Sequence, residues 1–366
     1  MKKNILKTMN KTTKSNMITY LLVVVVYIVV QLLVTTGNIS SLMKGLLVPL
    51  CVYVIAAISL NLVVGISGEL SLGHAGFMCV GAYSSAFFSA LVGDALPGML
   101  RFFFAILVGA GVAAIFGILI GIPVLKLRGD YLAIVTLAFG EIIKNLMNVL
   151  YVGRDSKGLH FSVKDTAGLH LEEDGEVIIK GALGITGTPK NSTFTIGIVL
   201  ILIALFIILN LIHSRSGRAI MAIRDNRIAA ESVGINITKY KLMAFSISAA
   251  LAGVAGVLYA HNLSTLTVKK FDYNTSILIL VFVVLGGIGN IRGSMIAAVI
   301  LTVLPEVLRG LSDYRMLIYA IVLIAMMLFN WAPGAIHWRE KVKVRIKSVN
   351  QKIRAKMNKR NMKEAE

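Results

Sequence analysis

Long apolar runs alternate with short polar connections along nearly the whole chain. Most of these runs have about the 20 residues that a helix needs to cross a bilayer core about 30 Å thick. The pattern predicts an all-α fold, a polytopic membrane helix bundle with about ten transmembrane helices. The ten runs are residues 17–34, 46–66, 70–92, 102–125, 131–152, 192–212, 242–261, 276–291, 293–308 and 315–333.

Glycine is frequent inside these runs, for example at Gly117 and Gly121 and at Gly109 and Gly111. Small residues let helix backbones approach closely where lipid provides no hydrophobic drive for association. We therefore expect tight helix packing at these positions.

Composition supports the membrane class. Of the 366 residues, 57% are hydrophobic and 15% are charged, whereas soluble domains have roughly 25% charged residues. This excludes an ordinary soluble protein and a disordered one. The two cysteines, Cys51 and Cys79, both lie in apolar runs, so a disulfide scaffold is excluded as well.

The formal net charge of +19 is concentrated in three segments. Residues 1–14, 213–241 and 339–366 carry +5, +4 and +8, whereas the polar stretch 153–191 is close to neutral. Cytoplasmic segments of membrane proteins are enriched in Lys and Arg, so the three basic segments are expected inside and residues 153–191 outside. Both termini are then cytoplasmic, which agrees with an even number of spans.

The same pattern divides the chain into three parts. A cytoplasmic basic N-terminus (1–16) is followed by a transmembrane domain (17–334) and a cytoplasmic polybasic tail (335–366). The transmembrane domain contains the extracytoplasmic loop 153–191 and the cytoplasmic loop 213–241. Basic charge placed in this way indicates contact with membrane lipid and not with nucleic acid.

No catalytic constellation is visible in the sequence. The six histidines lack the close spacings of metal sites, and no phosphate-binding loop of the G-x-x-x-x-G-K-[ST] type is present. We therefore expect no catalytic residues, no metal and no cofactor bound by this chain, which is predicted not to be an enzyme. If ATP drives it, a separate subunit must supply the ATPase.

Residues 65–77, between the second and third runs, are rich in glycine and polar residues. They include four glycines, two serines, Glu69 and His74. Irregular backbone at membrane depth is buried in protein or lines a cavity, because it cannot face lipid. Two interpretations are open: a polar helix connection capped by Ser71, or a gate in a translocation path. The gate candidates are Gly68, Glu69, Ser71, Gly73 and His74.

The fifth run contains Glu141 and Lys144, which lie on one face of a helix because they are three residues apart. Asn145 and Asn148 extend this polar stripe, which is expected to face other helices or water. An ionisable residue inside the membrane is a functional candidate, so Glu141 and Asn145 join the candidates for the path. The alternative is a self-contained structural ion pair.

Within loop 213–241 the sequence predicts a helix of about two turns. Asp225 or Asn226 is a suitable N-cap, residues 227–233 favour helix, and Gly234 suits the C′ position. A lone helix of this length is marginal in water, so its apolar side is expected in a groove of a partner. That side comprises Ile228, Ala229, Ala230 and Val233. The alternative is a helix on the membrane surface, held by Arg224 and Arg227.

Four stretches of the chain resemble the permease subunits of branched-chain amino acid ABC importers, of the LivM type. They are NLVVGISGELSLGHAGFMCVGAY (61–83), LRGDYLAIVTLAFGEIIK (127–144), SGRAIMAIRDNRIAAESVGINITKYKLMAFSISAALAGVAGVLYA (216–260) and VLGGIGNIRGSMIAAVILTVLPEVLR (284–309). The resemblance covers roughly residues 55–335 and makes 17–334 a permease domain. It implies a multi-pass protein of the bacterial cytoplasmic (inner) membrane. The implied partners are a second homologous permease, two ATP-binding cassette subunits that use ATP and Mg, and an extracytoplasmic solute-binding protein.

The resemblance also implies that loop 213–241 docks on the ATP-binding subunits. The positions that match this coupling region are Arg224, Asp225, Asn226, Arg227, Ala229, Ala230, Glu231 and Gly234. The chain departs from the general importer coupling motif at Ile228, where Glu is frequent, whereas Arg224, Asp225 and Asn226 match this subfamily. It also departs at Glu69, where an uncharged residue is expected. Loop 153–191 is also longer and more acidic than the corresponding Gly-rich segment.

The function expected from this resemblance is transport of branched-chain amino acids (Leu, Ile and Val) through a path formed with the second permease. Two alternatives stay open. One is a secondary transporter driven by H⁺ or Na⁺, which Glu141 and His74 could serve. The other is a permease of the same family for another small solute, such as urea or a short amide.

Overall fold

The computed structural model describes residues 11–37, 40–127, 129–172, 175–311 and 314–331. The first ten residues of the basic N-terminus and the polybasic tail 335–366 lie outside these ranges. The chain divides into two compact units, the first ending at Glu306 and the second beginning at Val307.

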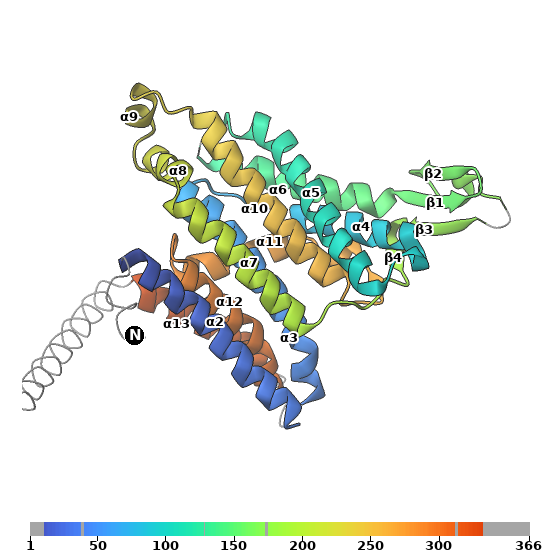
Figure 1. Cartoon of the computed structure of the whole chain (residues 1–366), viewed down its shortest axis with the longest axis horizontal. Helices are drawn as coiled ribbons and strands as arrows, with labels where there is room; N and C mark the ends of the chain where they lie inside the picture. Colours follow the sequence, from blue (N-terminus) through green and yellow to red (C-terminus); the bar gives the residue numbers. More distant parts are fainter. Residues whose placement is uncertain (1–10, 38–39, 128, 173–174, 312–313, 332–366) are drawn as a thin grey trace, which may run out of the picture. The chain divides into compact units, whose positions relative to one another are not determined.

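The described part of the chain is mainly helical (Figure 1). The long helices of the first unit are α2 (Lys11–Thr35), α3 (Ser41–Asn61), α4 (His74–Val92), α5 (Gly98–Val124), α6 (Asp130–Val149), α7 (Phe194–His213), α10 (Ile237–Ala260), α11 (Tyr273–Gly286) and α12 (Ile291–Val307). Two short helices, α8 (Arg215–Asp225) and α9 (Arg227–Ser232), lie between α7 and α10. In the second unit the described helix is α13 (Arg315–Trp331).

Single turns complete the helical elements. A π-helical turn, η1 (Leu62–Ser67), directly follows α3. The 3₁₀ turns are Gly93–Ala95, Ala167–Leu169, Gly181–Leu183, Val268–Lys270 and Leu308–Leu311.

Seven helices of the described residues are long and apolar enough to cross a membrane. They correspond to the first seven predicted runs. The remaining three runs form α11, α12 and α13, which have 14, 17 and 17 residues. The multi-pass helix bundle is therefore confirmed, whereas the count of ten spans and the cytoplasmic position of both termini stay predictions.

Helix α10 forms the centre of the first unit and packs against α3, α4 and α5. The predicted glycine packing is found on α5 at three of the four positions. A Cβ atom at Gly109 would lie 2.3 Å from Val257 of α10, and the nearest α10 atoms at Gly117 and Gly121 would be 2.6 Å away. Gly111 differs, because a Cβ atom there would meet no heavy atom within 4 Å.

Part of loop 153–191 folds into a small antiparallel sheet, which the all-α expectation missed. Its strands are β1 (Tyr151–Asp155), β2 (Gly158–Ser162), β3 (Glu176–Lys180), β4 (Ile185–Thr186) and β5 (Thr265–Leu266), in the order β2-β1-β3-β4-β5. Asp155 shapes the turn between β1 and β2, because its carboxylate accepts hydrogen bonds from the backbone N–H groups of Lys157 and Gly158 at 2.9 and 3.1 Å. The sequence analysis did not predict these strands, because the composition of this stretch is polar.

Strand β5 belongs to a second connection, the one between α10 and α11. Ile185 of β4 pairs with Leu266 of β5. The sheet and the pair α8–α9 lie at opposite ends of the helical bundle (Figure 1). We call these the sheet end and the loop end.

Candidate coupling and gating site

The segment after α3 is a true break in helical structure, as its composition predicts. The π-helical turn η1 ends at Ser67 and is followed by Gly68, whose φ of +75° lies in the left-handed region. The backbone N–H of Glu69 donates to the carbonyl of Val63 at 3.1 Å, and regular helix resumes only at His74. Residues 62–73, which we call the break, are mostly buried in protein.

His74 anchors the far side of the break. Its side chain is 2% exposed, and its Nε2 atom lies 2.6 Å from Oγ of Ser59 on α3. The Ser59 hydroxyl has one hydrogen, which it donates to the carbonyl of Ala56 at 2.9 Å, so His74 Nε2–H is the donor to Ser59. This contact ties the first residue of α4 to α3.

Ser71 does not cap α4, so that part of the sequence interpretation is wrong. The N-cap position is Gly73, without a side-chain hydrogen bond. The Ser71 hydroxyl is buried and has no hydrogen-bond partner. Gly73 is required by close packing, because a Cβ atom there would lie 2.2 Å from the carbonyl oxygen of Thr136 on α6.

Glu69 is paired with a lysine of α10. Its Oε1 atom accepts a hydrogen bond from Nζ of Lys241. The side chains of Lys241 and Glu69 are 10% and 12% exposed. Removing one partner would leave the other charge nearly buried and unpaired, which is costly. The charge of Glu69, unexpected from the family pattern, is therefore compensated within the chain.

Arg224 reaches the break from the last turn of α8. Its Nη1 atom donates to the carbonyl of Gly65 at 3.0 Å, while Nε and Nη2 donate to Asp225 at 3.0 and 2.8 Å. A Cβ atom at Gly68 would lie 2.6 Å from Cγ of Arg224. The structure thus brings together the coupling candidates and the gate candidates, which the sequence presented as two separate groups.

Helix α9 has the predicted caps. Of the two N-cap candidates, Asn226 takes the role, since its Oδ1 atom accepts from the N–H of Ala229 at 3.0 Å. Gly234 has a φ of +83°. The N–H groups of Gly234 and Ile235 donate to the carbonyls of Glu231 and Ala230 at 3.0 and 3.1 Å, which is the Schellman pattern of a helix C-terminus.

The predicted apolar side of α9 is divided between two directions. Ala230 is 4% exposed and packs with Ile223 and Ile237, so it belongs to the loop's own core and not to an outward contact. Ile228 and Val233 are 80% and 76% exposed. These two side chains, which we call the outer pair, are the large apolar groups that α9 and its C-cap residue, Val233, present to their surroundings.

Glu141 and Lys144 form the ion pair that their spacing predicts, with 2.7 Å between Oε2 and Nζ. The second carboxylate oxygen of Glu141 accepts from the backbone N–H of Tyr273, the first residue of α11, at 3.1 Å. Asn145 is exposed. The predicted ion pair is therefore confirmed, but it is not self-contained, because Glu141 also contacts α11. A role of Glu141 and Asn145 in the path stays a prediction.

Asn61, which the sequence analysis overlooked, joins the break to a second turn. Its Oδ1 atom accepts from the N–H of Gly289 at 2.9 Å, and its Nδ2 atom donates to Ser294 at 2.7 Å. A Cβ atom at Gly65 would lie 2.3 Å from the nitrogen of Gly289. The available signal was a single asparagine inside an otherwise apolar run.

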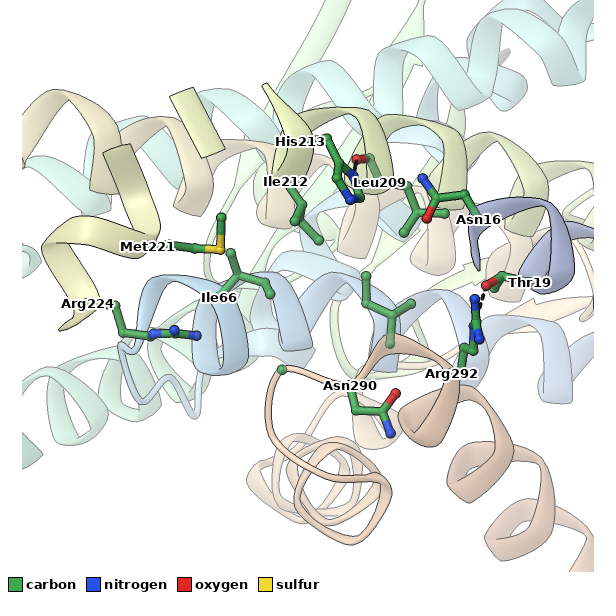
Figure 2. Close-up of a pocket in the computed structure, with 12 residues that line it drawn as sticks. Asn16, Thr19, Ile66, Leu209, Ile212, His213, Met221, Arg224, Asn290 and Arg292 are labelled. Carbon is green, nitrogen blue, oxygen red and sulfur yellow. Dashed lines mark hydrogen bonds between the residues drawn. The ribbon is translucent and has the colours of Figure 1, made fainter. Parts of the chain in front are cut away.

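An open pocket of about 620 Å³ lies beside the break at the loop end. Figure 2 shows it between α2, α7, α8 and the turn that precedes α12, with Arg224 and Ile66 along one side. Arg292 donates through Nε to Thr19 at 2.5 Å, which joins the start of α12 to α2. Within the described residues, no group of three or more His, Cys, Asp or Glu side chains could hold a metal ion.

Comparison with known proteins defines the class of protein to which this site belongs. Residues 42–329 match the family described as branched-chain amino acid transport system, permease component. The chain belongs to this family of ABC transporter permeases, and it is accordingly a multi-pass protein of the inner membrane.

Individual relatives indicate the same class of protein, the permeases of importers. The permease LivM of the high-affinity branched-chain amino acid transport system of Salmonella typhimurium is 36% identical over 306 residues, which is 81% of this chain and 70% of the relative. LivM of Escherichia coli K12 is 36% identical over 291 residues, 77% of this chain and 67% of the relative. The ribose import permease RbsC of Escherichia coli K12 is 25% identical over 286 residues, 75% of this chain and 81% of the relative. No solved structure matches the chain.

Proposed function

We propose that this chain is the permease subunit of an ABC importer for branched-chain amino acids. It forms the translocation path with a second, homologous permease, and a solute-binding protein delivers the substrate at the sheet end. Two ATP-binding subunits hydrolyse ATP with Mg at the loop end. The observation that carries the proposal is the match over 77–81% of the chain to two permeases whose names state this transport system.

The geometry of α9 supports the assignment of the loop end to the ATP-binding subunits. Its caps are complete, so the helix is preformed, and the outer pair Ile228 and Val233 offers apolar surface in a loop that is otherwise rich in charge. A preformed apolar projection suits a groove in a partner protein. The excess of Lys and Arg in residues 213–241 supports a cytoplasmic position for this end.

Uptake measurements test the substrate. In a strain that lacks its own branched-chain uptake systems, the chain and its partner subunits should restore uptake of labelled leucine. Unlabelled isoleucine and valine should compete, whereas urea and short amides should not. Competition by urea or an amide alone would reassign the chain to another solute. Loss of uptake on adding an uncoupler while cellular ATP is maintained would instead support the ion-coupled alternative.

A pair of neighbouring substitutions on α9 tests the docking role. Val233→Glu places a charge on the outer pair and should abolish co-purification of the ATP-binding subunits, because burying an unpaired charge is costly. Ser232→Glu is the matched control, since Ser232 is also exposed on α9 but is not part of the outer pair. Normal recovery of the ATP-binding subunits with Val233→Glu would remove the outer pair from the interface.

A further inference from the structure

Two cationic side chains, one before α9 and one after it, contact the break. Arg224 is in the last turn of α8, and Lys241 is in the first turns of α10. Arg224 binds the carbonyl of Gly65, and Lys241 binds the carboxylate of Glu69. The break is therefore bonded to α8, which precedes α9, and to the start of α10, which follows it.

The two contacts lie on opposite sides of Gly68 in the sequence. Gly65 and Glu69 flank Gly68, whose φ of +75° is strained for any other residue. A side chain at Gly68 would also collide with Arg224, because a Cβ atom there would lie 2.6 Å from its Cγ. Glycine is therefore needed at this position both for backbone conformation and for close contact with α8.

The chemistry of the contacts suits the transmission of movement. Both are charge-assisted hydrogen bonds, which are shorter and stronger than neutral ones. The ion pair between Lys241 and Glu69 is largely withdrawn from water, at 10% and 12% exposure, so it is screened weakly. Figure 2 shows Arg224 extending from α8 toward the segment that carries Ile66.

We propose that Arg224 and Lys241 are positioning residues that transmit movement of α8–α9 to the break and so couple ATP hydrolysis to opening of the translocation path. This proposal rests on the proposed function. It assigns to the ion pair a role in coupling that is separate from folding and from recruitment of the ATP-binding subunits. Neither residue is assigned a contact with the transported solute.

The test uses the complete transporter in proteoliposomes and measures solute uptake and ATP hydrolysis in the same preparation. Lys241→Met should lower uptake about tenfold relative to hydrolysis, within the range of typical coupling free energies. Exchange of the two charges, Glu69→Lys with Lys241→Glu, should recover a large part of the ratio of uptake to hydrolysis. Lys239→Met is the matched control, because Lys239 is exposed two residues away and should leave both rates unchanged.

The arginine is tested in the same way. Arg224→Lys keeps the charge but loses the planar guanidinium, which donates to Gly65 and to Asp225 at the same time. It should reduce the ratio of uptake to hydrolysis while the subunits still co-purify. A parallel fall of uptake and hydrolysis in the Arg224 and Lys241 variants, or wild-type uptake in Lys241→Met, would overturn the proposal.

A second measurement tests this proposal independently of which solute the complex transports. A cysteine in place of the buried Ser71 reports on opening of the break, and the native Cys51 and Cys79 are buried background. Binding of ATP to the complex should increase maleimide labelling at position 71, and Lys241→Met should remove the increase. If the wild-type complex transports no branched-chain amino acid but shows this response, only the substrate assignment fails. If ATP does not change the labelling at position 71, or if the increase persists in Lys241→Met, the proposed role of Arg224 and Lys241 in transmitting movement is wrong.

Discussion

Substitution of Gly256 tests the packing at the centre of the bundle. Gly256 lies on α10 and faces the backbone of α4, where a Cβ atom would lie 2.0 Å from the carbonyl oxygen of Met78 and 3.0 Å from the nitrogen of Ala82. Both neighbours are backbone atoms, so no side-chain rotation can relieve the collision. In Gly256→Ala, α10 and α4 must move apart.

The size of the effect follows from these distances. Ordinary contact begins at 3.4 Å, so the two backbones must separate by about 1.4 Å at this point. A gap of about 0.5–1 Å already forfeits a quarter to a half of the dispersion energy of the facing atoms. Overpacking in cores typically costs about 1–3 kcal/mol. Because α4–α10 is one of the most extensive contacts in the unit, we expect Gly256→Ala to cost about 3 kcal/mol.

Gly111→Ala is the matched control, since it makes the same chemical change in a helix where the new methyl group meets open space. Alanine favours a helix over glycine by about 0.8–1.0 kcal/mol, so this variant should be neutral or slightly more stable. The free energy of unfolding of each purified variant is measured by titration with SDS, followed by circular dichroism. Equal stabilities of the two variants would refute the assignment of Gly256 to a close backbone contact.

Three further predictions concern the loop end, the sheet end and the orientation. Gly234→Ala meets no atom within 4 Å, so backbone strain alone should cost about 1–2 kcal/mol and should be seen as faster amide exchange at the end of α9; unchanged exchange would contradict the positive φ. The Lys157 side chain lowers the pKa of Glu172 from its ordinary 4.5, so the stability that this contributes is present above pH 4.5 and is lost as the pH falls through the lowered pKa. A spin label in β2 should become mobile on acidification, and Glu172→Gln should show that mobility already at neutral pH; an identical acid response in Glu172→Gln would exclude this carboxylate as the cause. In intact cells, a cysteine at Gly175 should react with an impermeant maleimide and one at Asn226 should not; the reverse result would invert the orientation.

Features that depend on neighbours along the chain were predictable from the sequence. The apolar runs located the long helices, and spacing alone placed Glu141 beside Lys144. The caps of α9 followed from Asn226 and Gly234, because both act on backbone groups within a few residues. The irregular break also followed from local composition, since four glycines at a membrane boundary do not favour a continuous helix.

Contacts between distant segments were decided by the tertiary structure. Arg224 and Gly65 are 159 residues apart, and Lys241 and Glu69 are 172 residues apart. Nothing in the local pattern of either segment specifies these partners. In the sheet at the other end, the pairing of β4 with β5, which comes from a different connection, was likewise decided by the tertiary structure.

The burial of Ala230 and the missing cap at Ser71 have the same explanation. A hydrophobic pattern shows that Ala230 is apolar, and residue type shows that Ser71 can cap a helix, but neither shows which surface the side chain meets. Ala230 is buried because it packs against Ile223 and Ile237, which belong to the helices on either side of α9. The sequence by itself determined which segments form the long helices, because hydrogen bonds and propensities act over a few residues. Only the tertiary structure decided the partners, because close packing depends on the shape and spacing of surfaces that are brought together from distant parts of the chain.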